Sequence, residues 1–263
     1  MDYRSMKFEV RDNVAWITFN RPEVFNAINH RATHEFHDIV NRCSVDQSIR
    51  AVVLTGTGDR AFCAGGDVAE FVKRGDEVEM HLREMTTVLH AGISRLAWLR
   101  APVIAAVNGV AAGAGLSFAA CCDLAIAADT ARFTSAYTQI GLTPDGSSTF
   151  FLTRLLGRRR VMELYLTNRV LTAQEALEWG LVNRVVPAAD LISEVTKLAT
   201  QLAKGPTQAY GGVKKLVMMS PNDTLESQME RETRSIAEMS RTADAREGIH
   251  AFVEKRKPGF VGR

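Results

Sequence analysis

The sequence predicts an α/β protein, because short apolar segments that suit buried strands alternate with helical segments. Three segments carry this prediction, namely IRAVVLTGTG at 49–58, APVIAAVNG at 101–109 and DLAIAADTARFT at 123–134. The first two are continuous apolar runs with β-branched residues, which are typical of strands buried on both faces, and the third predicts another short strand. With 263 residues, of which 46% are hydrophobic, the chain has enough apolar material for one large domain with a smaller appendage.

The start of the chain predicts a pair of strands followed by a helix. The segment MKFEVRDN alternates between apolar and polar residues, and VAWITFN continues after a turn at Asp12-Asn13. The loop RPEVFNAIN then leads into a helix over roughly residues 30–46.

After Pro187 the sequence predicts helices alone, separated by capping and breaking residues. We therefore predict a core domain over residues 1–195 and a helical oligomerisation subdomain over 196–263, because helices appended to a core often pack against a neighbouring subunit. The helices are expected over roughly residues 190–203, 206–219, 222–240 and 244–254.

Composition and charge exclude several classes of protein. The formal net charge is +2, from 32 basic and 30 acidic side chains, so nothing favours general binding to nucleic acid. The first residues lack the apolar region of a signal peptide, and no apolar run is long enough for a membrane span. The four cysteines form no Cys-x-x-Cys pair, which indicates reduced thiols in a cytoplasmic protein. No metal motif is evident, and His30, His34 and His37 are interpreted as a solvated helix face.

Two glycine-rich loops follow predicted strands and open predicted helices. They are AGGD at 64–67 and AGAG at 112–115. The first N–H groups of a helix have no partner within the helix, so small residues there let the backbone bind a negative charge closely. Two such N–H groups that converge would form an oxyanion hole, and the alternative is tight packing of helix on strand. Neither loop fits a dinucleotide fingerprint or a Walker loop.

The segment GLTPDGSS at 141–148 places one acid, Asp145, between a proline and a glycine. Pro-Asp-Gly is a strong turn signal, because an aspartate side chain can bond to nearby backbone N–H groups or cap a following helix. The same carboxylate could instead be catalytic. The two interpretations remain open from the local sequence alone.

Taken together, segments spread over nearly the whole chain resemble the enoyl-CoA hydratase/isomerase, or crotonase, superfamily. The resemblance implies a spiral of ββα turns with a C-terminal α-helical trimerisation region, and a homotrimer or a dimer of trimers. It also implies an acyl-CoA thioester substrate and no cofactor, since the coenzyme A is part of the substrate. The matching segments are NRPEVFNAIN at 20–29, AFCAGGDVAEF at 61–71, APVIAAVNGVAAGAG at 101–115, DLAIAADTARF at 123–133, the long stretch from Ile140 to Val186, and REGIHAFVEKRKPGF at 246–260.

The resemblance also assigns roles to individual residues. It implies that the backbone N–H groups of Gly66 and Ala114 form the oxyanion hole for the thioester carbonyl. Lys255 or Lys257 in the basic tail would reach phosphates of the ligand in its own or a neighbouring subunit, or would simply be solvated. The implied substrate-binding residues are Asn26, Ala27 and Ala64 for the adenine end of coenzyme A, Gly66, Asp67, Val68 and Ala69 along the pantetheine path, and Gly113, Tyr137 and Lys255.

The sequence departs from the hydratases of this family at both catalytic glutamates. Ser117 occupies the first position and Tyr137 the second, and neither side chain is a carboxylate base at neutral pH. Tyr137 either donates a hydrogen bond to substrate or packs. An acid at the place of Asp145 occurs among isomerases of the family, and the chain is most similar to the ring-epoxide (1,2-epoxyphenylacetyl-CoA) isomerases of bacterial phenylacetate breakdown.

The predicted function is therefore an acyl-CoA isomerase that shifts a C=C bond or rearranges a ring epoxide, with Asp145 as the proton shuttle. Two alternatives remain: a hydratase-type lyase or hydrolase that uses Asp145 on water, and an inactive acyl-CoA-binding protein.

Overall fold

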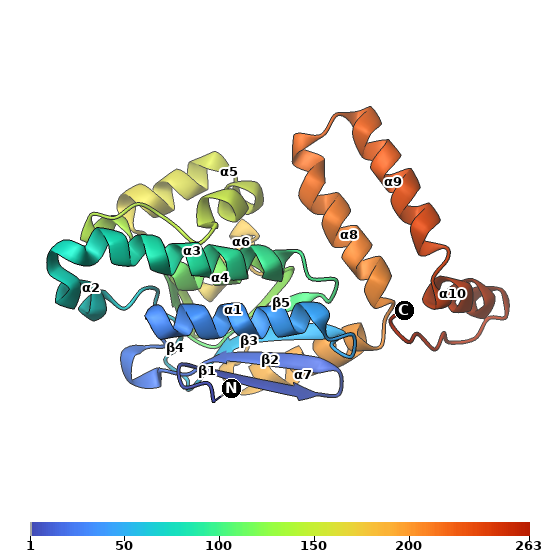
Figure 1. The fold of residues 1–263 in the computed structure, drawn as a ribbon, viewed down its shortest axis with the longest axis horizontal. Helices are drawn as coiled ribbons and strands as arrows, with labels where there is room; N and C mark the ends of the chain where they lie inside the picture. Colours follow the sequence, from blue (N-terminus) through green and yellow to red (C-terminus); the bar gives the residue numbers. More distant parts are fainter. Residues whose placement is uncertain (1) are drawn as a thin grey trace.

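The computed structural model describes residues 2–263 and contains two β-sheets with helices packed around them (Figure 1). The larger sheet has six strands in the order β1-β2-β3-β5-β7-β10. β1 and β2 pair antiparallel, whereas the other neighbours are parallel. These strands are β1 (Met6–Arg11), β2 (Val14–Phe19), β3 (Ala51–Gly56), β5 (Val103–Val107), β7 (Leu124–Ala128) and β10 (Arg184–Val186).

The smaller sheet gives the fold its spiral. Its order is β4-β6-β8-β9, and each of its first three strands follows directly on a strand of the larger sheet and precedes a helix. The chain therefore repeats a strand–strand–helix turn three times, as the family resemblance implies. The four strands are β4 (Ala61–Cys63), β6 (Val110–Ala112), β8 (Arg132–Thr134) and β9 (Leu171–Thr172).

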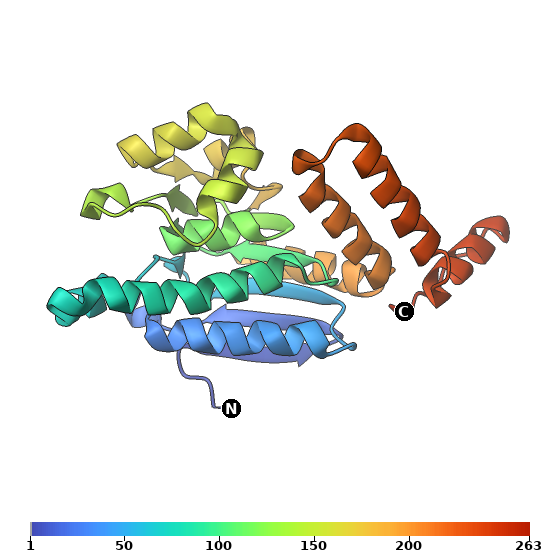
Figure 2. The ribbon, with the colours of Figure 1, turned by 45° about the horizontal axis from the view of Figure 1, so that its top comes forward.

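Helices cover both faces of the larger sheet. α1 and α3 lie side by side, and α7 packs on the opposite face through Leu191, Val195 and Ala199 (Figures 1 and 2). The helices are α1 (His30–Val45), α2 (Val68–Arg74), α3 (Val78–Ala97), α4 (Ala114–Cys121), α5 (Ser148–Thr167), α6 (Ala173–Trp179), α7 (Leu191–Ala203), α8 (Thr207–Met219), α9 (Leu225–Met239) and α10 (Ala243–Val253).

One predicted strand is in fact two. The segment at 123–134 forms β7 in the larger sheet and β8 in the smaller one. The N–H of Ala131 donates to the carbonyl of Ala128 at 2.9 Å, and this closes a turn that sends the chain from one sheet to the other. The turn at Asp12 and Asn13 is present as predicted, and both residues have positive φ angles of 52° and 62°.

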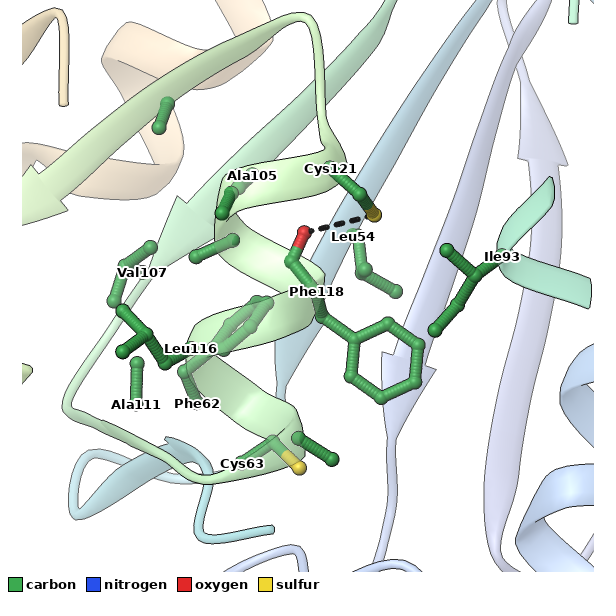
Figure 3. Packing of buried hydrophobic residues seen from close by; sticks show 14 of the residues in the cluster. Leu54, Phe62, Cys63, Ile93, Ala105, Val107, Ala111, Leu116, Phe118 and Cys121 are labelled. Carbon is green, nitrogen blue, oxygen red and sulfur yellow. Dashed lines mark hydrogen bonds between the residues drawn. The ribbon is translucent and has the colours of Figure 1, made fainter. Parts of the chain in front are cut away.

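α4 is the central helix of the core, and all of its residues are buried. A helix that is apolar on every side must lie inside the protein, and Figure 3 shows Leu116 and Phe118 of α4 among side chains from the surrounding strands and from Ile93 of α3. The contact is closest at Gly115, where a Cβ atom would lie 1.9 Å from the carbonyl oxygen of Cys63. Only glycine therefore allows α4 to start against β4.

The last three helices extend away from the two sheets (Figures 1 and 2). The boundary predicted between residues 195 and 196 falls inside α7, which packs on the larger sheet as one unit, so the extended part begins at α8. α8 is tied to the core where Lys214 Nζ lies 2.7 Å from Asp123 Oδ2. No helix within residues 2–263 combines the length and the apolar character needed to cross a membrane.

Candidate functional site

A largely apolar cavity of about 340 Å³ lies between α2, α3, the start of α4 and the segment before α5. It contains both glycine-rich loops and Asp145, so the three predicted catalytic residues meet in one place. Among the residues that the structure describes, Asp145 is its only charged lining residue. The lining residues are Ile28, Ala64, Gly65, Gly66, Val68, Phe71, Leu82, Met85, Thr86, Leu89, Gly113, Ala114, Ala136, Tyr137, Gln139, Ile140, Leu142, Thr143 and Asp145.

The two glycine-rich loops are in direct contact. A Cβ atom on Gly65 would lie 3.4 Å from the backbone nitrogen of Ala114, and a Cβ atom on Gly113 would lie 3.5 Å from the Cα atom of Gly65. Both glycines have positive φ angles, 95° and 52° respectively, which L side chains rarely adopt. The sequence therefore needs glycine at these positions to bring the two backbones together.

The two predicted oxyanion N–H groups are available to a ligand. Ile28 donates to the carbonyl of Gly65 at 2.7 Å and accepts from the N–H of Asp67 at 2.9 Å, so the peptides on both sides of Gly66 are held. Ala114 is the first residue of α4, where an N–H has no partner within the helix. Within residues 2–263 neither the Gly66 nor the Ala114 N–H donates to a protein acceptor outside the helices and strands.

Gly66 is further constrained by the ring of Phe71 on α2. A Cβ atom on Gly66 would lie 2.7 Å from Phe71 Cζ, so a side chain at this position would displace the ring. The ring also lines the cavity. α2 therefore forms the wall beside the first predicted oxyanion N–H.

The carboxylate of Asp145 does not cap a turn or a helix. α5 begins after Ser147, which makes no side-chain cap, and the Asp145 carboxylate accepts no backbone N–H within the part of the chain that the structure describes. The backbone carbonyl of Asp145, and not its side chain, accepts from the N–H of Ser148 at 3.2 Å. The carboxylate is thus not used as a cap, 29% of the side chain is exposed, and Asp145 lines the cavity.

Tyr137 holds one oxygen of this carboxylate. Its hydroxyl donates to Asp145 Oδ1 at 2.6 Å and lies 3.4 Å from Ser117 Oγ. Burial, followed by the nearby Asp145 charge, raises the pKa of Tyr137 far above its usual value, so the phenol remains a donor across the ordinary pH range. Ser117 is fully buried and donates to the backbone carbonyl of Asp145 at 3.1 Å. The two residues that replace the glutamates of the hydratases therefore both contact Asp145.

His90 on α3 was not identified from the sequence. Its Nε2 atom lies 3.7 Å from Asp145 Oδ2 and accepts from the N–H of Gly146 at 3.1 Å. A ring nitrogen that accepts a hydrogen bond carries no proton, so in this arrangement Nε2 is an acceptor and not a donor. A single histidine within an amphipathic helix gives no sign in the sequence that it faces an acid more than fifty residues later.

Comparison with known proteins identifies the family. The model of the enoyl-CoA hydratase/isomerase family matches residues 9–263. The chain belongs to the enoyl-CoA hydratase/isomerase family. A 4-chlorobenzoyl coenzyme A dehalogenase from an Arthrobacter species is 42% identical over 87% of this chain and 83% of its own. A 1,2-epoxyphenylacetyl-CoA isomerase of Escherichia coli is 37% identical over 97% of each chain. The crystal structure of an enoyl-CoA hydratase from Bacillus anthracis gives a TM-score of 0.92 at 31% identity, over 98% of this chain and 100% of the other.

The residues assigned to coenzyme A by the family resemblance fall into two groups. Ala64, Gly66, Val68, Gly113 and Tyr137 line the cavity. Asp67 and Ala69 instead line a neighbouring cleft of about 600 Å³, together with Arg21 and Asn29 from before α1 and with Lys73 and Arg74 from the last turn of α2.

Asn26, Ala27 and Asp67 have partners inside the protein. The buried Asn26 amide donates to the carbonyls of Thr57 at 3.0 Å and Ala61 at 2.8 Å. The Arg21 guanidinium donates to the carbonyl of Ala27 and to Asp67 Oδ2, each at 2.8 Å. The Asp67 side chain also caps α2 by accepting from the Glu70 N–H. Side chains in this region therefore fix the shape of the loop.

Lys255 directly follows α10, which lies at the opposite end of the molecule from α2 (Figure 1). Within one chain it does not line the cavity. Among residues 2–263 no group of three or more histidine, cysteine and acidic side chains could hold a metal ion. The cysteines are free, and burial raises the pKa of Cys43 and of Cys63 to about 12, so both thiols are protonated.

We expect Tyr137→Phe to lower kcat for acyl-CoA turnover about ten- to a hundred-fold, because a hydrogen bond to a charged group contributes about 1.5–3 kcal/mol. Steady-state kinetics would measure the loss, and titration with a non-reactive acyl-CoA would show unchanged binding. Tyr210→Phe on α8 removes a phenol outside the cavity and serves as the matched control. A kcat within two-fold of wild type for Tyr137→Phe would mean that the phenol only packs.

Proposed function

We propose that the protein is an acyl-CoA isomerase that moves a C=C bond, or rearranges a ring epoxide, through an enolate of the thioester. The proposal is carried by one observation: within residues 2–263, Asp145 is the only charged residue that lines the apolar cavity, and the Gly66 and Ala114 loops line the same cavity. Family membership supports a coenzyme A thioester as the substrate class. No cofactor beyond the coenzyme A of the substrate is required.

The chemistry follows from charge development at the thioester. With the carbonyl oxygen between the Gly66 and Ala114 N–H groups, the negative charge of an enolate is met by two fixed donors, each worth about 3–4 kcal/mol in comparable enzymes. Asp145 removes a proton from the carbon α to the carbonyl of a 3-enoyl thioester, and the C–H electron pair enters a conjugated dienolate. The same carboxyl group returns the proton to the γ carbon, which leaves a 2-enoyl thioester and an ionised Asp145.

Hydration is less well supported by this arrangement. Two carboxylates position and activate water in the hydratases that the sequence resembles, whereas Ser117 and Tyr137 occupy those places here. Both residues contact Asp145 or its backbone, so they support one acid and supply no second one. An inactive binding protein is disfavoured because the oxyanion loops and the acid are all present.

The apolar lining limits the acyl group. Since no lysine, arginine or histidine lines the cavity, an acyl group with its own carboxylate would be desolvated without a partner. We therefore infer an uncharged acyl group, which includes the aromatic ring of a phenylacetyl-type substrate. The free cysteines, three of which are buried, suit a reducing compartment, and we assign the enzyme to the cytoplasm.

We expect wild-type protein in D₂O to convert a 3-enoyl-CoA into the 2-enoyl-CoA without addition of water, with deuterium at the γ carbon only in turnovers in which the Asp145 carboxyl proton exchanges with solvent before it is returned. Asp145→Asn keeps the shape and the Tyr137 hydrogen bond but removes the base, so turnover should fall about a hundred- to ten-thousand-fold. Product analysis by mass spectrometry measures both effects, and Asp190→Asn, an exposed acid before α7, is the matched control. Retained turnover in Asp145→Asn would contradict the assignment of the base, and hydrated product would favour the lyase.

A second candidate function is hydrolytic displacement of a halide from an aromatic acyl-CoA. The observation that favours it is His90, whose Nε2 lies 3.7 Å from Asp145 Oδ2, and the Arthrobacter relative is named as a 4-chlorobenzoyl coenzyme A dehalogenase. In this reaction an Asp145 oxygen attacks the ring carbon that carries the halogen, and the added charge moves through the ring to the thioester oxygen in the oxyanion hole. Halide then leaves with the electron pair of its bond, and an aryl ester of Asp145 remains.

Hydrolysis of this ester completes the second candidate reaction. His90 accepts a proton from water as the water oxygen attacks the ester carbonyl of Asp145, and the bond from that carbonyl carbon to the aryl oxygen breaks. The ring keeps the original Asp145 oxygen as its hydroxyl group, and Asp145 gains the oxygen of water. The sum consumes one water and releases halide and a proton.

Isotopic water distinguishes the second candidate from the first. In a single turnover of 4-chlorobenzoyl-CoA in H₂¹⁸O, we expect displacement to place ¹⁸O in the Asp145 peptide and not in the product. His90→Gln would then accumulate the covalent ester, detectable as a mass increase of the intact protein, whereas Asp145→Asn would form none. Absence of halide release would exclude this activity and leave the isomerase proposal.

We further propose that the chain assembles as a homotrimer or a dimer of trimers through its last three helices. α9 buries no residue of its own, and a row of large apolar side chains is exposed on this part of the chain. In such an assembly Lys255 of one subunit would approach the ligand of its neighbour. The exposed residues are Val213, Val217, Leu225, Met229, Ile236, Ile249, Phe252 and Val253.

Sedimentation velocity tests the assembly. We expect wild type to sediment as three or six chains, and Phe252→Asp, at a side chain that is 85% exposed in one chain, to shift the protein to smaller species because a buried unpaired charge disfavours the interface. Val45→Asp at the end of α1 introduces the same charge at another exposed apolar residue and should leave the mass unchanged. A monomeric wild type at micromolar concentration would contradict the proposal.

A further inference from the structure

Three hydrogen-bond donors hold the backbone carbonyl of Asp145. Its carbonyl oxygen accepts from Ser117 Oγ at 3.1 Å, from Ser148 Oγ at 2.9 Å and from the Ser148 N–H at 3.2 Å. The Ser148 hydroxyl donates its single proton to Asp145, so its lone pairs remain to accept a bond. The hydroxyl of Tyr165 donates to Ser148 Oγ at 2.9 Å. A directed chain of hydrogen bonds therefore runs from Tyr165 through Ser148 to Asp145.

A break in α5 makes this chain possible. Gly157 has φ 75° and ψ 158°, which are not helical, and the helix changes direction there. The second half of α5 thus returns toward the first, and Tyr165 meets Ser148, which lies seventeen residues earlier. Tyr165 is buried and does not line the cavity. Its hydroxyl therefore reaches the active site only through Ser148.

The same end of α5 also holds the segment that carries Tyr137. The backbone carbonyl of Tyr165 accepts from Thr138 Oγ1 at 2.6 Å, and the carbonyl of Leu164 accepts from Ser135 Oγ at 3.0 Å. Ser135 and Thr138 lie on either side of Tyr137. Both partners of the Tyr137–Asp145 hydrogen bond are consequently attached to one short stretch of α5.

The turn after Asp145 needs such support. Gly146 and Ser147 have positive φ angles of 62° and 67°, and a non-glycine residue keeps this conformation only where its surroundings impose it. The Ser147 side chain caps nothing. Release of the Asp145 carbonyl would therefore let the turn relax and move the carboxylate away from the thioester.

We propose that Tyr165 is a positioning residue that sets the place of the Asp145 carboxylate through Ser148. The proposal rests on Asp145 as the reacting carboxylate, and it holds for both candidate reactions because both use that group. Burial raises the pKa of Tyr165, so its phenol stays protonated and keeps donating. A small displacement of a reacting group is enough to reduce the rate of a positioned reaction strongly.

Tyr165→Phe removes the hydroxyl and keeps the ring in its buried place. We expect kcat to fall about ten-fold, as for the loss of one hydrogen bond, while KM and the affinity for a non-reactive acyl-CoA stay unchanged because Tyr165 touches no substrate. Ser148→Ala should give a loss of similar size, and the double variant should lose no more than the larger single loss, because the two residues act in one chain. Tyr3→Phe, which removes a phenol that donates to Asp38 beside α1, should leave kcat unchanged.

A structural role alone would give a different pattern. If Tyr165→Phe lowers the melting temperature but leaves kcat within two-fold of wild type, or if the losses in kcat add in the double variant, the positioning role is overturned. If Tyr165→Phe does not fold, Ser148→Ala removes the same link from its other end and decides the question alone. The result is independent of the Asp145→Asn experiment, since full activity of Asp145→Asn would refute the proposed function, whereas full activity of Tyr165→Phe would refute only this inference.

Discussion

The contact between α4 and β4 is the constraint on which the active site depends. Gly115 brings the start of α4 against the carbonyl of Cys63, and β4 leads directly into the loop that contains Gly66. Because α4 begins at Ala114, the same contact aligns its free N–H with the first loop. The proposed oxyanion hole is thus a product of core packing: the helix that begins with one donor is pressed onto the strand that leads into the loop with the other. The donors are backbone N–H groups, so the alanine side chain at position 114 does not affect this proposed role.

The acid is held in the opposite way, by side chains. Tyr137 fixes one carboxylate oxygen, and Ser117 fixes the backbone carbonyl of the same residue. A second oxygen, Oδ2, remains to react at the cavity. Proton transfer and nucleophilic attack place the same demand on this oxygen, namely a fixed distance from the acyl carbon. The active-site framework therefore suits both reactions, and the difference between them lies in the acyl group and in the partner of Oδ2.

Much of the fold was predictable from local sequence, whereas the support of the site was not. Buried strands require apolar runs, and helix ends require capping residues, so both can be recognised within a few positions of the sequence. The two loops require glycines close together, which makes them equally easy to recognise. The division of 123–134 into two strands depends on a turn at Asp129 and Thr130 that no glycine or proline marks in the sequence. His90 reaches Asp145 only because α3 packs beside it, and Tyr165 reaches Ser148 only because the two halves of α5 fold back on each other. Such contacts join residues far apart in the chain, and their spacing carries no periodic signal.

His90 Nε2 cannot bond to the Gly146 N–H and to the Asp145 carboxylate at the same time. While Nε2 accepts from the Gly146 N–H, it has no proton to donate to Asp145, so it helps to hold the turn and leaves Oδ2 unpaired. A proton on Nε2 would break the bond to Gly146 and favour pairing with the carboxylate 3.7 Å away. A proton shuttle needs Oδ2 unpaired, and therefore needs the neutral His90 throughout. In halide displacement, Nε2 must be without a proton only until water attacks the Asp145 ester. The ring that has gained the water proton can then pair with the Asp145 carboxylate that hydrolysis restores. The place of His90 Nε2 between the Gly146 amide and the Asp145 carboxylate therefore suits both reactions. The reactions differ in whether the His90 ring must gain a proton: the proton shuttle never requires it, whereas displacement requires it when water attacks the ester.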